Sequence, residues 1–166
     1  MKQDPLVQEV DELIRQRFAI PADATFDGRT LEQCTLGHRV SLLFLSSGSG
    51  MIDASELYAG IEVPSGVSTQ FAQRAIVAYL ESEPDDLTID CNRGLAALTK
   101  AVPYQVQGVD RVLTIYPFRL RDDCACALAD SMGRELHLYL HQSFTVRDQE
   151  IKQLLTVWKA NRLAGD

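Results

Sequence analysis

The sequence lacks any long uninterrupted run of apolar residues. The longest run near the middle of the chain is Leu42-Leu43-Phe44-Leu45, whereas a helix needs about 20 apolar residues to cross a bilayer. The N-terminal residues 1–5 lead directly into an amphipathic pattern and contain no apolar core of a secretory signal peptide. We therefore expect a cytoplasmic protein that makes no contact with a membrane.

Positive charge is also scarce. The chain has 16 Lys and Arg residues against 23 Asp and Glu residues, which gives a net charge of −7, and it contains no basic run. Phosphate backbones are bound mainly by clusters of Lys and Arg, so this composition argues against a nucleic-acid partner. An acidic surface keeps a protein soluble and suits a basic partner.

Motifs that carry phosphate or acyl chemistry are absent. In Gly48-Ser49-Gly50, Asp53 stands where a dinucleotide fingerprint needs its third glycine, and no Lys-Ser or Lys-Thr follows to make a Walker loop. Ser47 and Met51 occupy the outer positions at which a nucleophile elbow needs glycine. This stretch is typical of a flexible hairpin turn.

Cysteine occurs only four times, at positions 34, 91, 124 and 126. In the cytosol these residues are expected to be reduced thiols. On a strand, Cys124 and Cys126 would lie about 6.5–7 Å apart, which is too far for a relaxed disulfide, and a zinc ion needs two further ligands. We expect them to be small core residues and predict no metal site.

Histidines and paired carboxylates give no catalytic centre either. His137 and His141 on one strand face would lie about 13 Å apart, too far to share an ion. The acidic pairs at 85–86 and 122–123 fall in expected turns, where solvation explains them. We therefore predict no catalytic residue and no cofactor.

Several segments have the apolar spacing of helices. Asp4 and Pro5 suit the start of the first helix, and Thr30-Leu31-Glu32-Gln33 has the spacing of a capping box. In the last helix, Trp158 belongs to an apolar stripe that we expect in the core or, in part, in a dimer contact. The expected helices are residues 5–18, a short one from 30 that ends at Gly37, 68–81, 90–98 and 145–163.

Other segments have the pattern of strands, and together they predict an α+β fold. Residues 134–141 alternate between apolar and polar side chains, and 111–120 is rich in β-branched and aromatic residues. With no repeat and no linker, the 166 residues are expected to form one domain with an antiparallel sheet and helices packed on it. The expected strands are 38–46, 51–61, 87–89, 111–120, 124–129 and 134–141, the last three forming a meander that the final helix covers.

The C-terminal third resembles the end of a GAF domain, and the N-terminal helix with its hairpin suits the same family order. Such domains have a strand with a Pro-hydrophobic pair, a strand of small residues, a Gly before a Leu-x-Leu strand, and a Phe-Thr-x-x-Asp stretch that opens the last helix. The matching pieces are Tyr116-Pro117-Phe118, Cys126-Ala127-Leu128-Ala129, Gly133, Leu136-His137-Leu138-Tyr139, and Phe144-Thr145 with Asp148.

The resemblance implies a GAF/PAS-like regulatory domain that senses a small molecule or a protein, forms a homodimer and has no catalytic activity. In this family the ligand site is a hollow between the sheet and the helices and loops on one face, where an apolar ligand body is buried and a few polar groups orient it. Carried onto this chain, the candidate lining residues are Tyr58, Arg93, Tyr104, Tyr116 and Cys126.

Two alternatives remain open. The chain resembles the small, acidic, dimeric α+β chaperones of type III secretion in its helix 6–18 and its closing segment 136–163, which implies binding of an extended client segment. Some stand-alone GAF proteins are methionine sulfoxide reductases, but their Gly-rich loop is missing around Cys91-Asn92-Arg93-Gly94. That second resemblance would imply thiol redox chemistry.

Overall fold

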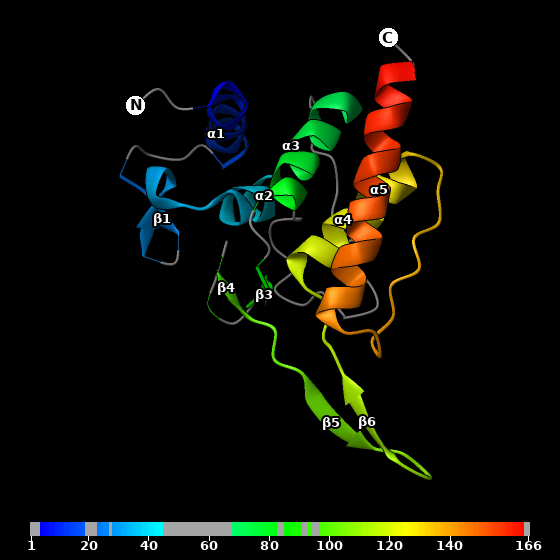
Figure 1. The fold of residues 1–166 in the computed structure, drawn as a ribbon. Helices are drawn as coiled ribbons and strands as arrows, with labels where there is room; N and C mark the ends of the chain where they lie inside the picture. The colour runs from blue at the N-terminus through cyan, green and yellow to red at the C-terminus, as the bar shows by residue number, and fades with distance from the viewer. Residues whose placement is uncertain are drawn as a thin grey trace.

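The computed structural model describes residues 4–18, 23–26, 28–44, 68–82, 85–90, 93 and 97–164. In these residues the chain is α+β, as expected, with five α-helices, one short 3-10 helix and three small sheets (Figure 1). The elements are, in order, α1 (Pro5–Phe18), β1 (Thr25–Phe26), β2 (Arg29–Thr30), η1 (Leu31–Gln33), α2 (Leu36–Phe44), α3 (Thr69–Glu81), β3 (Leu87–Ile89), β4 (Leu98–Lys100), β5 (Tyr104–Gln107), β6 (Val112–Ile115), α4 (Leu120–Ser131) and α5 (Phe144–Ala164).

Three of the expected helices are confirmed, and local signals explain where they begin. α1 starts after Asp4, whose carboxylate accepts a hydrogen bond from the backbone N–H of Leu6 at 2.8 Å. α3 starts after Ser68, whose hydroxyl accepts from the backbone N–H of Phe71 at 3.1 Å. Each side chain satisfies a helix N–H that has no partner inside the helix. α5 covers the whole of the expected segment and extends it to Ala164.

The strand expected for 38–46 is wrong, because residues 36–44 form helix α2. Val40, Leu42 and Leu43 are all buried, and so are His38 and Arg39. A segment that is buried on every side shows neither a clear period of 2 nor one of 3.6, so its pattern cannot separate a strand from a helix. The expected turn at 47–50 and returning strand at 51–61 lie outside the described residues.

The single antiparallel sheet is also wrong for the described residues, which contain three separate antiparallel pairs, β1–β2, β3–β4 and β5–β6. β3 was expected, but its partner β4 begins at Leu98, where the helix predicted for 90–98 was to end. β5 was not expected at all, and β6 occupies only Val112–Ile115 of the strand predicted for 111–120.

The meander expected at the C-terminus does not form. Residues 124–129 lie in α4, because Ala and Cys side chains are small enough for a helix buried between α3 and α5, and alanine is the best helix former. Residues 134–141 follow the outside of α4 and α5 as irregular chain (Figure 1). Leu138 is buried but Leu140 is exposed, although an alternating strand would place both on the same face, so the chain does not follow the expected period of 2 here.

The core lies between the helices. Side chains of α2, α3, α4 and α5 form one buried cluster, in which Ala75, Leu128 and Ile151 are almost fully buried. Trp158 was expected in this core and is only half-buried at its margin, where its indole N–H donates to Gln73 at 3.3 Å. The sheets contribute little apolar area to the cluster, so helix packing carries most of the hydrophobic stabilisation.

Candidate functional site, an exposed hairpin on a buried ionic base

The β5–β6 hairpin has one apolar and one mostly polar face. Opposite residues of an antiparallel pair lie on the same face of the sheet, and alternate residues along each strand change faces. The register therefore defines an apolar face formed by Tyr104 opposite Ile115 and Val106 opposite Leu113. The other face carries Gln105 opposite Thr114 and Gln107 opposite Val112.

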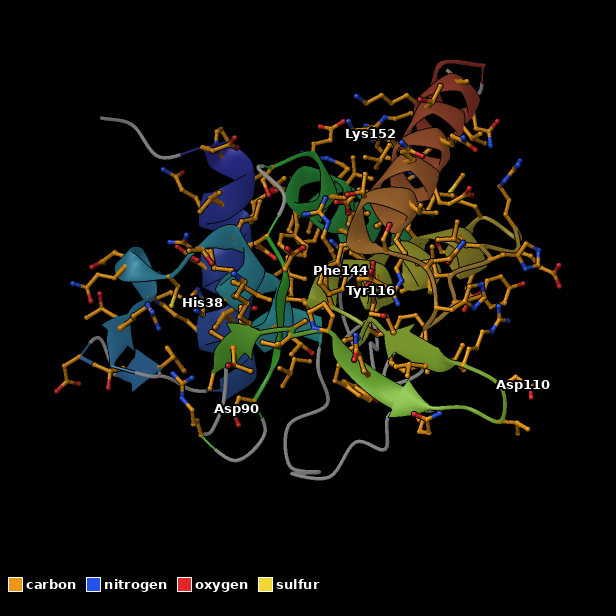
Figure 2. All side chains as sticks on the ribbon, turned by 60° about the horizontal axis from the view of Figure 1, so that its bottom comes forward. His38, Asp90, Asp110, Tyr116, Phe144 and Lys152 are labelled. Carbon is orange, nitrogen blue, oxygen red and sulfur yellow. The ribbon has the colours of Figure 1, made fainter. Side chains whose placement is uncertain are left out.

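This apolar face is open to solvent. Tyr104 is 53% exposed, Val106 42% and Leu113 40%, although all three are large apolar side chains. Among the described residues, six of the nine exposed large apolar side chains lie between 102 and 113. The hairpin projects from the helices (Figure 1), and Asp110 at its turn lies far from the packed body (Figure 2). Nothing in the described part of the chain covers the face.

The base of the hairpin is held by Arg147, which is fully buried on α5. Its guanidinium donates to the carbonyl oxygens of Tyr116 and of Pro117, the latter at 3.0 Å, where the chain leaves β6. It also donates to the carbonyl oxygen of Tyr139 at 2.9 Å and to the carboxylate of Asp122 at 2.9 Å. One side chain thus ties the end of the hairpin to α4, α5 and the irregular segment.

A second buried guanidinium, that of Arg119, lies at the start of α4. It donates to Asp122, Asp86 and Asp148, in each case at 2.8 Å, and so joins three elements. Burial by itself would lower the pKa of Arg119, but hydrogen bonds and attraction from Asp122, with help from Asp148 and Asp86, raise it overall. Its guanidinium also lies 4.7 Å from the centre of the Phe144 ring, a favourable cation–π distance.

The two arginines meet the aromatic residues at the base of the hairpin. Arg147 lies 4.8 Å from the ring centre of Phe118. Tyr116 packs edge to face on Phe144 with ring centres 5.4 Å apart, and the two residues lie together in Figure 2. Burial lowers the pKa of Arg147, and Asp122 opposes this effect, but an arginine remains charged at neutral pH. The base is therefore a largely buried cluster of two arginines and several aromatic rings, in which aspartates balance the positive charge.

A short sequence repeat underlies this cluster and was missed when the sequence was judged free of repeats. Phe118-Arg119-Leu120-Arg121-Asp122 and Phe144-Thr145-Val146-Arg147-Asp148 share the pattern Phe-x-x-Arg-Asp. Each copy lies at the start of a helix, α4 or α5. The arginine of each copy pairs with the aspartate of the other: Arg147 with Asp122 at 2.9 Å, and Arg121 with Asp148 at 3.4 Å.

The acidic pair at 122–123 is buried, contrary to the prediction of a solvated turn. Asp122 is fully buried and Asp123 is 4% exposed, both in the first turn of α4. Burial, and then repulsion from Asp122, raise the pKa of Asp123 from 3.8 to about 8, while Arg147 opposes the shift. Asp123 is thus largely protonated at neutral pH. Asp85 and Asp86 are half-buried and bonded, Asp85 to the Tyr79 hydroxyl at 3.1 Å.

The structure does not bring the predicted site residues together around one pocket. Tyr104 and Tyr116 lie near each other, because Tyr104 pairs with the residue before Tyr116. Arg93 is exposed in the β3–β4 connection, where it pairs with Asp90 at 3.8 Å. Cys126 lies in the middle of α4, and Tyr58 lies outside the described residues.

The described cysteines have the properties of core residues. Cys34 and Cys124 are buried and Cys126 is half-buried. Burial raises the pKa of all three thiols, that of Cys126 to about 12, with further increases from Asp123 and Asp122. Thiolate is the reactive form, so this environment disfavours redox chemistry at these positions. On a helix, Cys124 and Cys126 point to different sides rather than to the same side.

A groove in the described part of the structure lies away from the predicted site residues. This groove of about 650 Å³ is bordered by α1, α3, α5 and the end of α4, and none of the predicted ligand residues lines it. Among the residues that the structure describes, no group of three or more His, Cys, Asp or Glu side chains is arranged to hold a metal ion. None of the described helices combines the length and apolar character required to cross a membrane.

Comparison with known proteins identifies no relative of this chain. No protein-family model matches the chain, and no curated protein or solved structure has significant similarity to it.

Proposed function

We propose that this protein is a non-catalytic binding module whose β5–β6 hairpin holds an extended segment of a partner protein. The observation that carries the proposal is the apolar face defined above, which is exposed on a hairpin with a rigid base. A large exposed apolar patch on an otherwise well-packed protein marks an interaction site. The chain is anchored where it leaves β6, since Arg147 donates to the carbonyl oxygens of Tyr116 and Pro117.

The stability of the hairpin supports a bound partner. An isolated two-stranded hairpin is marginal in water and needs a third strand or a packed face to be stable. Here neither strand pairs with a third strand among the described residues, and the face carries Val106 and Leu113. Full burial of one such side chain contributes about 1.5–3 kcal/mol. A partner that covers the face would therefore stabilise the hairpin as well as gain affinity.

The size of the face favours an extended segment over a folded partner. Each strand is only four residues long, whereas a stable interface between folded proteins buries about 800 Å² on each side. A peptide that adds as a strand along the edge of β5 or β6 gains main-chain hydrogen bonds, and its alternate side chains pack beside the apolar residues of the hairpin and partly cover them. We therefore expect the bound segment to carry apolar residues at every second position.

The regulatory role expected from the sequence was the sensing of a small molecule or of a protein, and binding of a partner protein is the second of these. Binding of an extended client segment, as expected of a secretion chaperone, is one form of it. The GAF-like arrangement depended on a C-terminal meander that the described residues do not form. For that reason the proposal rests on the hairpin and not on the family resemblance. A cytoplasmic, homodimeric protein remains compatible with it as a further proposal.

Peptide selection tests the proposal. A display library of random linear peptides is selected against the full chain, and the enriched peptides are measured against two variants of equal strand propensity. Val106→Thr/Leu113→Thr replaces two of the four residues of the apolar face by polar ones, and Gln105→Thr/Gln107→Thr alters only the mostly polar face. We expect alternating apolar peptides that bind the second variant like the unaltered protein and the first at least tenfold more weakly.

Two results would overturn this function. One is that enriched peptides bind both variants equally well, which would place binding elsewhere. The other is a dimer in sedimentation equilibrium that dissociates in Val106→Thr/Leu113→Thr and persists in Gln105→Thr/Gln107→Thr, which would assign the face to a second copy of this chain. As a positive control, hydrogen exchange of the β5–β6 amides is measured with and without bound peptide, because strand addition must slow this exchange.

A further inference from the structure

The groove bordered by α3 and α5 has an apolar wall that is held in a fixed position. Phe71, Met132 and Trp158 line it and are half-buried. Gln73 fixes the indole, because its amide oxygen accepts from Trp158 at 3.3 Å while its amide nitrogen donates to the hydroxyl of Ser131 at 2.9 Å. A flat, rigid wall of this kind suits a planar ligand body.

The same groove carries two guanidinium groups without a carboxylate partner. Arg74 and Arg162 both line it, and neither forms an ion pair with any described residue. Arg162 lies 5.2 Å from the ring centre of Trp158. The buried arginines Arg119 and Arg147 are, by contrast, fully engaged with aspartates.

The local charge of the groove is opposite to that of the chain. Its lining contains Arg74 and Arg162 against one acidic residue, Glu9, so the local balance is 2 − 1, or +1. The whole chain has a net charge of −7. Two cations that line one groove beside an aromatic wall, and that have no carboxylate partner among the described residues, attract a ligand that carries negative charge.

From these observations we infer that the groove binds a small aromatic carboxylate or a similar planar monoanion. The ring of the ligand packs on Trp158 and Phe71, and its carboxylate accepts hydrogen bonds from Arg74 and Arg162, which present planar donor forks. The groove volume of about 650 Å³ lies within the usual range for small-molecule sites. This site is separate from the hairpin and does not depend on its function.

Trp158 supplies a direct assay, because it is the only tryptophan in the chain. 2-Naphthoate is titrated into the 166-residue chain while the fluorescence of Trp158 is recorded, and 2-naphthamide serves as the neutral isostere. We expect saturable quenching by naphthoate with a Kd of about 1 mM or tighter, as ligand efficiency predicts for a molecule of this size. The amide should bind at least tenfold more weakly.

Matched variants identify the anion contacts. Arg74→Gln/Arg162→Gln should weaken naphthoate binding at least tenfold. Arg134→Gln/Lys152→Gln removes the same number of exposed positive charges outside the groove and should leave the Kd unchanged. The hairpin variant Val106→Thr/Leu113→Thr should also bind naphthoate normally, which separates this site from the proposed protein-binding function.

The inference is overturned if naphthamide binds as tightly as naphthoate, or if the variant without the two groove arginines keeps the unaltered Kd. Absence of saturable quenching at concentrations tenfold above the expected Kd would also overturn it. Circular dichroism of each variant shows whether the fold is retained. Backbone NMR shifts confined to α3 and α5 on titration would locate the ligand independently of fluorescence.

Discussion

Replacement of Arg147 by methionine tests whether the ionic base holds the fold together. Methionine keeps most of the aliphatic length but removes the guanidinium, which is fully buried. The change deletes the ion pair with Asp122 at 2.9 Å and the hydrogen bonds to the carbonyl oxygens of Tyr116, Pro117 and Tyr139. No other described side chain donates to these carbonyls, and only that of Tyr139 keeps a backbone donor, the N–H of Gln142 at 3.1 Å.

The expected loss of stability follows from the groups that Arg147→Met would leave without their hydrogen-bond donor. Removing one partner of a buried ion pair costs about 3–5 kcal/mol, because the other charge stays buried. Each buried carbonyl without a donor adds about 1–3 kcal/mol unless water reaches it. Arg119 still donates to Asp122 at 2.8 Å and limits the damage. We therefore expect the free energy of unfolding to fall by about 3–5 kcal/mol, a large part of the total for a domain of this size.

Urea unfolding, followed by circular dichroism and by the fluorescence of Trp158, measures this change. Lys159→Met is the matched control, since it removes a positive charge from the same helix, where Lys159 pairs with Glu81 at the surface. An exposed pair is worth at most about 1 kcal/mol. Arg147→Lys keeps the charge but loses the planar fork, so its stability should lie between those of the unaltered protein and Arg147→Met.

A loss below about 1 kcal/mol for Arg147→Met would refute the reasoning, because it would show that the buried carboxylate and carbonyls do not need this donor. If Arg147→Met does not fold, Arg147→Lys decides the matter, and stability equal to the unaltered protein would be the contrary result. Hydrogen exchange at the N–H of Tyr116, which donates to Leu140 at 2.8 Å, reports whether the hairpin base loosens.

Three further predictions concern single positions. In the folded chain Asp123 keeps its proton up to about pH 8, whereas in the unfolded chain it releases the proton near pH 4. The contribution of protonated Asp123 to the free energy of unfolding is therefore full below pH 4 and is lost as the pH rises to 8. Asp123→Asn should flatten that fall, which reaches about 1.4 kcal/mol per pH unit, and an unchanged slope would contradict the assignment. Gly133 has a φ of 68° with open space around it, so Gly133→Ala should cost only the backbone penalty of about 1–2 kcal/mol in urea unfolding, whereas a larger loss would indicate a clash. Trp158→Ala should cost less than the 3–5 kcal/mol typical of a core aromatic residue, because the indole is half-buried, and a full core-sized loss would show that the groove is closed in solution.

The elements predictable from the sequence are those whose signals are local and one-sided. α1, α3 and α5 each place apolar residues on one side of a helix, and a side chain such as Asp4 or Ser68 marks a helix start. The α+β class was predictable only at a coarse level, because among the described residues only 87–89 and part of 111–120 form the strands that were expected. Gly133, which follows the end of α4, adopts a positive φ that glycine accommodates without strain.

Elements that are buried on several sides could not be predicted from the spacing of their apolar residues. α2 and α4 are surrounded by other helices, so their apolar residues show no preferred side, and the small residues of 124–129 suit a strand as well as a helix. The extended segment 134–141 alternates like a strand, but pairing is a property of two segments and not of one.

In the ionic base and the groove, too, some features are set by residues near one another in the chain and others by the packing of the helices. The sequence by itself determined the acidic balance, the main amphipathic helices and the two Phe-x-x-Arg-Asp segments, because each is a property of residues near one another in the chain. Only the tertiary structure decided that Arg147 meets Asp122, 25 residues away, and that Arg74 and Arg162 share one groove. Such contacts depend on how α3, α4 and α5 pack, and packing depends on the shapes of all three helix surfaces together.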